Sequence, residues 1–158
     1  MLEIHVILSL IGIVSGFVVL YGLLTARPFG AWTAIFLATT ILTSLTGFPL
    51  APFGFDAARA IGVISLVLLA AAVVALYAFH LAGPWRWIYI VTAATALYLN
   101  VFVGVVQAFQ KLPFLQPLAP TQSEPPFVVA QLVVLVAFIV IGVLAVRRFH
   151  PKPRTSGK

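Results

Sequence analysis

The sequence predicts an all-α membrane protein, a polytopic bundle of five transmembrane helices with its N-terminus outside and its C-terminus inside. Of its 158 residues, 63% are hydrophobic and only 8% are charged, whereas a soluble domain has about 25% charged residues. The hydrophobic residues fall into five long runs, and about 20 helical residues cross a hydrocarbon core about 30 Å thick. Lipid therefore surrounds most of this chain, and too few residues remain for a large soluble domain.

The first two predicted spans cover residues 4–24 and 31–48. The first follows Glu3 without a basic leader, so we expect a mature helix rather than a cleaved signal peptide. Pro28 and Gly30 separate it from the second span, because both residue types interrupt helices. The second span is rich in threonine, and the predicted topology depends on whether this segment crosses.

The other three predicted spans cover residues 57–81, 85–109 and 127–149. Asp56 directly precedes the third span, where a carboxylate is expected to cap the helix N-terminus. A linker with five prolines, residues 110–126, separates the last two spans. The membrane domain therefore covers residues 1–149, and a basic cytoplasmic tail follows at 150–158.

The basic residues predict the orientation, because Lys and Arg in short loops stay on the cytoplasmic side. Only Arg59 and Lys111 fall outside, and all three acidic residues also fall there. If residues 31–48 did not cross, the split of basic residues would weaken from seven against two to six against three. The cytoplasmic set is Arg27, Arg86, Arg147, Arg148, Lys152, Arg154 and Lys158. We therefore expect a multi-pass protein of a bacterial inner (plasma) membrane.

The composition also excludes several function classes. The chain has no cysteine, which removes disulfides, thiolate metal sites and iron–sulfur clusters. The positive charge clusters after an apolar run, which is typical of a membrane stop signal rather than of nucleic-acid binding. No predicted span has an Asp, Glu, Lys or Arg near its middle, which disfavours ion-coupled transport. No catalytic motif is present, so we expect no catalytic residue, no metal and no cofactor, and a protein that is not an enzyme.

Histidine is the commonest ligand of haem and of many metals. His5 is expected at the outer end of the first span, whereas His80 and His150 are expected at the inner ends of the third and fifth spans. No two histidines are expected to face each other in the middle of the membrane. This placement disfavours haem and is more typical of interfacial anchors.

Amide and hydroxyl residues form two stripes in the outer half of the predicted bundle. Asn100, Gly104, Gln107 and Lys111 share one face of the fourth span, and the second span has a threonine stripe. We expect these stripes to line a cavity that opens outward, toward two acidic loop residues. The candidate ligand-binding residues are Asn100, Gln107, Gln131, Thr39, Thr43, Thr46, Asp56 and Glu124.

A simpler interpretation is that these polar residues only join helices by hydrogen bonds, worth on the order of 0.6 kcal/mol each. The alternative hypothesis is that Asn100 and Gln107 contact a lipid, a quinone-like molecule or another amphiphile. Asn100 is the main candidate, because an amide near the middle of the bilayer is the most costly polar group in these spans.

The sequence leaves several functions open. The first is a non-enzymatic accessory subunit or a binder of a lipophilic or amphiphilic molecule. The alternative is a transporter or channel assembled as an oligomer, and a membrane enzyme would require Glu124, Asp56 and His5 to converge. Expected partners are membrane lipids, a lipophilic ligand, and further copies of the chain or a larger membrane complex. Gly12 and Gly16 form a GxxxG pair that fits close packing either within the bundle or in a homodimer.

Overall fold

The computed structural model describes residues 2–50 and 56–151, and within these ranges the chain is all-helical with no strand. The long helices are α1 (Leu2–Leu24), α2 (Gly30–Gly47), α3 (Ala57–Val73), α4 (Trp85–Lys111) and α5 (Pro125–Arg148). A π-helical turn, η1 (Val74–Ala78), extends α3, and a short 3₁₀ turn, η2 (Gln116–Leu118), lies between α4 and α5. All five helices are long and apolar enough to cross a membrane. The prediction of an all-α multi-pass bundle is confirmed.

The predicted and observed helix ends differ by at most three residues. The largest difference is at the end of the third span, which finishes with η1 and not at residue 81. There His80 and Leu81 take positive φ angles of 48° and 60°, and the chain turns back. The rings of Phe79 and Trp85 stack across this turn with centroids 4.1 Å apart. This contact ties the end of one span to the start of the next.

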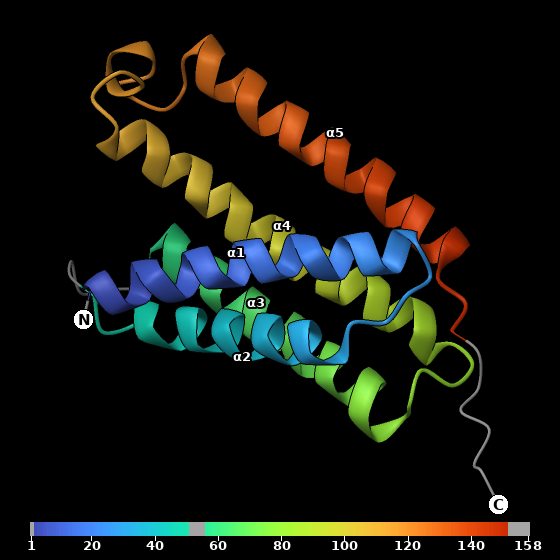
Figure 1. Ribbon diagram of the computed structural model, residues 1–158. Helices are drawn as coiled ribbons and strands as arrows, with labels where there is room; N and C mark the ends of the chain where they lie inside the picture. Colours follow the sequence, from blue (N-terminus) through green and yellow to red (C-terminus); the bar gives the residue numbers. More distant parts are fainter. Residues whose placement is uncertain (1, 51–55, 152–158) are drawn as a thin grey trace, which may run out of the picture.

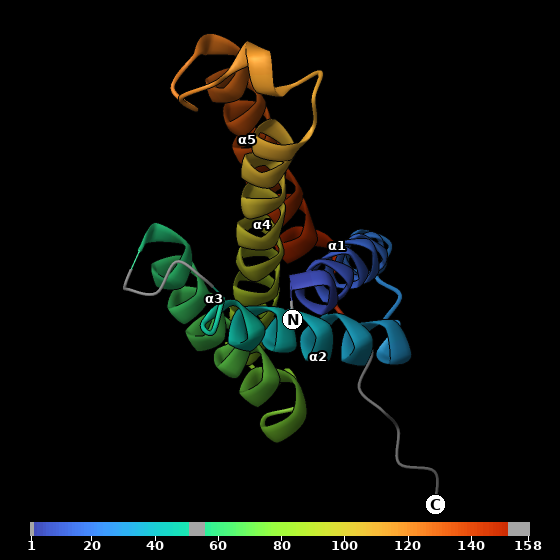
Figure 2. The ribbon, with the colours of Figure 1, turned by 90° about the vertical axis from the view of Figure 1, so that its left-hand side faces the viewer.

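The helices are arranged around α4, which contacts each of the other four (Figure 1). α1 and α2 form one hairpin, and α4 and α5 form another. Figures 1 and 2 show that the joined ends of α4 and α5 diverge from α1, α2 and α3. α5 lies at the periphery, where Ala145 is its only buried residue. The bundle is thus packed at one end and spread at the other.

The packed end contains the hydrophobic core. Phe36, Leu69, Ile90 and Leu97 are at most 1% exposed, and they come from α2, α3 and α4. Gly16 allows α1 to join them, because a Cβ atom there would lie 2.5 Å from Leu97 Cδ1 and 3.0 Å from Phe36 Cδ2. The GxxxG pair therefore packs within this bundle.

The same end holds the C-terminus of α5. Arg86 Nη1 donates hydrogen bonds to the carbonyl oxygens of Val146, at 2.8 Å, and Phe149, at 2.7 Å. Carbonyls in the last turn of a helix have no partner within the helix, so a cation is favourable there. Arg86 thereby fastens the start of α4 to the end of α5.

Candidate ligand cavity

A cavity of 680 Å³ lies in the spread half of the bundle, between α1, α2, α3 and α4. This volume is within the range of about 300–1,000 Å³ that is typical of small-molecule sites. Its lining runs from the ends of these helices inward to the level of Asn100. Its polar and charged lining residues are His5, Ser9, Thr40, Thr43, Ser44, Asp56, Arg59, Ser65, Asn100, Gln107, Gln110 and Lys111.

The inner end of the cavity contains a hydrogen-bonded pair. Ser9 Oγ donates to Asn100 Oδ1 at 2.9 Å, and Asn100 Nδ2 lies 3.5 Å from the carbonyl oxygen of Ser9. Gly12 makes room for this contact, because a Cβ atom there would lie 3.0 Å from Thr40 Oγ1 and 3.2 Å from Asn100 Nδ2. Three helices therefore bring polar groups together at one level of α1.

Two threonine hydroxyls in the cavity wall have no hydrogen-bond partner among the described residues, Thr40 Oγ1 and Thr43 Oγ1. Both side chains belong to the buried face of α2, and the residues are only 2% and 8% exposed. Threonines in helices usually donate to the carbonyl four residues earlier, as Thr33, Thr92 and Thr95 do here. Both hydroxyl oxygens are sealed from solvent, so they are buried groups without a partner, and a molecule in the cavity does not contact them.

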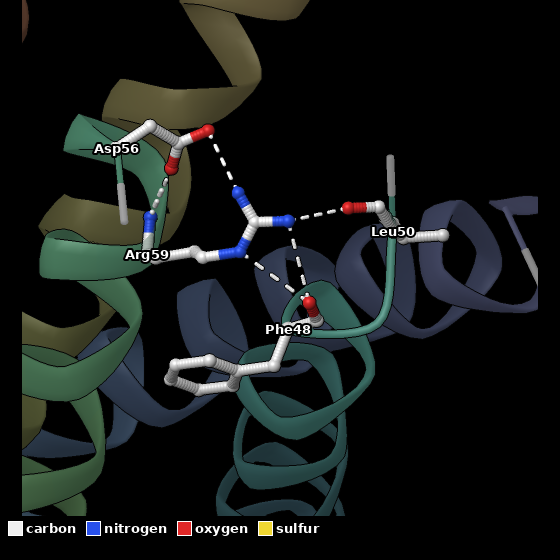
Figure 3. A network of polar contacts seen from close by, with 4 residues as sticks. All are labelled: Phe48, Leu50, Asp56 and Arg59. Atoms are coloured by element: carbon white, nitrogen blue, oxygen red, sulfur yellow. Dashed lines mark hydrogen bonds and ion pairs between the residues drawn. The ribbon is translucent and has the colours of Figure 1, made fainter. Parts of the chain in front are cut away.

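An ion pair stands at the mouth of the cavity. Asp56 Oδ1 accepts a hydrogen bond from Arg59 N at 2.9 Å, so the predicted cap of the third helix is confirmed. The guanidinium of Arg59 pairs with Asp56 Oδ2 at 3.0 Å and donates to the carbonyl oxygens of Phe48 and Leu50 (Figure 3). Arg59 therefore joins the start of α3 to the end of α2, and its charge is balanced locally.

Two other basic side chains lie at the mouth. His5 Nδ1 is 3.1 Å from Thr46 Oγ1, a contact that joins the ends of α1 and α2. Lys111 is the last residue of α4 and is exposed. Lys111 makes no hydrogen bond or salt bridge with any residue that the structure describes. Its ammonium group is the unbalanced positive charge of the cavity lining.

The structure places four of the eight candidate residues in the cavity lining: Thr43, Asp56, Asn100 and Gln107. The other four lie elsewhere. Thr39 and Thr46 donate to carbonyl oxygens of their own helix, those of Ile35 and Leu42. Gln131 Nε2 donates to the carbonyl oxygen of Phe102 at 3.2 Å and joins α5 to α4. Glu124 lies in the connection between α4 and α5.

Glu124 organises that connection locally. Its carboxylate accepts hydrogen bonds from Thr121 N at 3.1 Å, Thr121 Oγ1 at 2.8 Å and Ser123 N at 3.1 Å. Desolvation favours the neutral carboxyl, but these hydrogen bonds outweigh it and hold the pKa of Glu124 below its ordinary value of 4.5. Glu124 does not join Asp56 and His5 at the cavity, which the enzyme hypothesis required.

Several cavity residues were not among the sequence candidates, notably Ser9, Thr40 and Lys111. For Thr40, the sequence signal that could have identified it is the continuation of the apolar face of α2. The buried positions of α2 are Thr33, Phe36, Leu37, Thr40 and Thr43. Following Phe36 and Leu37 outward by helical spacing leads to Thr40 and Thr43 and leaves Thr39 and Thr46 beside this face.

Within residues 2–50 and 56–151, no three His, Asp or Glu side chains group closely enough to hold a metal ion. Comparisons with protein-family models, with curated proteins and with solved structures found no match to this chain.

Proposed function

We propose that this chain is a non-enzymatic membrane protein that binds an amphiphilic molecule in the cavity between α1, α2, α3 and α4. The main support is a ligand-sized space of 680 Å³ that is lined by both polar and apolar side chains. An amphiphile matches this lining, because its polar part can meet side chains such as Gln107 and its apolar part can meet side chains such as Ile13 and Val103.

The packing below the cavity favours a binding protein over the alternative of an oligomeric channel. Phe36, Leu69, Ile90 and Leu97 fill the other half of the same four-helix region. A conducting path needs a polar or hydrated route between the two faces. The cavity instead ends at a closed apolar core within one protomer.

We also propose that the cavity opens on the outer side of a bacterial inner membrane, with the chain N-out and C-in. The distribution of Lys and Arg supports this orientation. Arg27, Arg86, Arg147 and Arg148 belong to the packed end, whereas Arg59 and Lys111 line the cavity. The ligand is then a molecule that is present in, or enters from, the outer leaflet.

Filling the cavity tests the binding proposal. Gly104 lines the cavity, and a Cβ atom there would contact only Ile13 Cδ1, at 3.5 Å. Gly104→Leu therefore places a side chain in the space without forcing the helices apart. Gly142→Leu is the matched control, because a Cβ atom at Gly142 meets nothing within 4 Å.

The measurement is native mass spectrometry of the full chain extracted with its own lipids. We expect the unmodified protein and Gly142→Leu to retain a bound amphiphile and Gly104→Leu to lose it. Asn100→Leu is expected to lower its occupancy. Equal occupancy in all four proteins, with Asn100→Leu more stable than the unmodified chain, would show that the polar residues only pack helices.

A further inference from the structure

We propose that the packed end of the bundle is a docking surface for the headgroups of anionic phospholipids, held by exposed arginines beside a belt of Trp and Tyr side chains. This surface lies at the end opposite the cavity, so the inference does not depend on the proposed function. It also holds on whichever side of the membrane the packed end lies.

Charge is strongly separated along the bundle. The packed end has four arginines: Arg27, Arg86, Arg147 and Arg148. Every acidic residue of the chain belongs to the start of a helix at the other end: Glu3 in α1, Asp56 before α3 and Glu124 before α5. The sequence continues after the packed end with three more basic residues: Lys152, Arg154 and Lys158. Seven basic residues are therefore separated from all three carboxylates.

The arginines of the packed end are not neutralised by the protein. Arg27, Arg147 and Arg148 are exposed, and their side chains make no hydrogen bond or salt bridge with any residue that the structure describes. Arg86 uses Nη1 to hold two carbonyl oxygens of α5, which carry only partial charge. Guanidinium groups form strong, often two-pronged hydrogen bonds with phosphate. An anionic headgroup is therefore the partner that fits this charge.

These arginines also come from neighbouring helix ends. Arg86 contacts the last turn of α5, which contains Arg147 and Arg148. α1 packs against α5, and the ends of the two helices lie side by side (Figure 1). Arg27 N donates a hydrogen bond to the carbonyl oxygen of Gly22 at 2.8 Å, so Arg27 stays close to the end of α1. The positive charges thus gather where α1, α4 and α5 meet.

Aromatic side chains surround this end at the depth of the lipid headgroups. Four of them are exposed: Tyr21 in α1, Trp32 in α2, Tyr77 in η1 and Trp87 in α4. Rings of Trp and Tyr favour the membrane interface, where one side of the ring is apolar and the other is wet. The belt therefore indicates that the arginines lie near lipid phosphates. This placement favours a lipid headgroup over a soluble acidic molecule, which approaches only from the water.

The tryptophans provide the readout for a test, because all three belong to the packed end: Trp32, Trp85 and Trp87. The full chain is reconstituted in dioleoyl phosphatidylcholine vesicles with increasing fractions of a brominated phosphatidylglycerol or a phosphatidylcholine with the same brominated chains. Bromine near the headgroup quenches tryptophan fluorescence on contact. Both leaflets carry the same lipids, so quenching reports the lipid beside the packed end in either orientation.

We expect phosphatidylglycerol to quench with an apparent affinity about fivefold above that of phosphatidylcholine, the effect of one basic residue near an anionic surface. The preference should fall to within about twofold in about 1 M salt, where exposed charges are screened within about 3 Å. Equal quenching by the two lipids at low salt would overturn the proposal and leave the arginines with a role in topology alone.

Charge-removing variants identify the residues responsible. Arg147→Gln combined with Arg148→Gln should bring phosphatidylglycerol to within about twofold of phosphatidylcholine. Both side chains are exposed and make no contact that the fold needs, so the thermal unfolding midpoint should be unchanged. Arg27→Gln and Lys111→Gln are a matched pair, because each removes one exposed charge, from the packed end and from the cavity end. Only Arg27→Gln should lower the preference.

Two further outcomes would contradict the proposal. A preference that persists in the double arginine variant, or that Lys111→Gln lowers as much as Arg27→Gln, overturns the assignment to the packed end. Heparin that binds the unmodified chain in an uncharged maltoside detergent but not the double variant, with no preference between the lipids, identifies a soluble acidic partner instead. Neither outcome affects the cavity, which Gly104→Leu tests separately.

Discussion

Asn100 and Ser9 show how a single polar residue is accommodated within a span. A primary amide in lipid is costly unless it is paired, and here the amide oxygen accepts from the Ser9 hydroxyl at 2.9 Å. Gly12 has no side chain that would keep α1 away from Asn100 and Thr40. The three residues form a small polar centre at the inner end of the cavity.

This centre predicts an energetic coupling between Ser9 and Asn100. A double-mutant cycle with Ser9→Ala and Asn100→Leu should give an interaction of about 0.6–1.7 kcal/mol, the range measured for hydrogen bonds between membrane helices. The free energy of unfolding is measured by titration with sodium dodecyl sulfate in mixed micelles. The control pairs Asn100→Leu with Thr95→Val, whose hydroxyl donates to Val91 of its own helix. If the effects of Ser9→Ala and Asn100→Leu on the free energy of unfolding add to within about 0.3 kcal/mol, the hydrogen bond between these residues is contradicted.

Glu124 predicts a pH dependence of the connection between α4 and α5. Its pKa is lower in the folded protein than its ordinary value of 4.5. Its contribution to loop stability is therefore present above pH 4.5 and is lost as the pH falls through the lowered pKa. Hydrogen exchange of residues 119–126, corrected for intrinsic rates, should show protection lost on acidification. Glu124→Gln should already lack that protection at pH 7, and a pH-independent difference between the two proteins argues against this role.

Local roles of residues were easier to predict from the sequence than contacts between different helices. Asp56 was predictable as a helix cap because the cap is local and involves only the four consecutive residues from Asp56 to Arg59. The sequence did not predict that Thr40 lines the cavity while Thr39 and Thr46 lie outside it. Thr39 and Thr40 differ by one position in the helix and both hydroxyls lie near Gly12, so only the three-dimensional packing shows that Thr40, and not Thr39, belongs to the cavity lining.

At the scale of helices, α1 depends on small residues for its position. A Cβ atom at Gly16 would lie 2.5 Å from Leu97 Cδ1, too close for the present packing. Gly16→Ala should therefore destabilise the bundle by about 1–3 kcal/mol, as overpacking of a filled core does. Gly142→Ala is the control, since it meets open space and gains helix propensity. Equal stabilities of the two variants in the detergent titration contradict this packing of α1.

The helix boundaries followed closely from the sequence, because proline, glycine and charged residues interrupt the apolar runs. The end of α3 was the exception. Its apolar residues continue through Phe79, but the chain leaves the helix in the π turn η1, and Phe79 stacks on Trp85. Hydrophobic periodicity does not predict where this helix ends, because the turn involves a ring contact with the next span.

At the scale of the whole molecule, one half of the bundle contains the packed apolar core and the other half contains the cavity. The number of spans followed from composition, but the arrangement around α4 did not, because each apolar helix packs equally well in lipid on any side. In such a chain the pattern of hydrophobic residues says little about which helices are neighbours. Figure 2 shows how the end of α4 spreads away from α1 and α3, and the cavity lies between these helices and α2.

The sidedness of the molecule has a direct test. A fusion after Lys158 should make green fluorescent protein bright and alkaline phosphatase inactive, because the basic end is retained in the cytoplasm. The same two reporters inserted in the connection at Pro117, between α4 and α5, should behave in the opposite way. Phosphatase activity after Lys158 would place the cavity on the cytoplasmic face instead.

The peripheral position of α5 has a consequence for biosynthesis. Every described residue that lines the cavity lies between Leu2 and Lys111, so the cavity is formed by the first four helices. During translation these helices emerge before α5 does. We therefore expect the nascent chain to acquire its pocket while still attached to the ribosome, with α5 docking last as Arg86 meets its final turn.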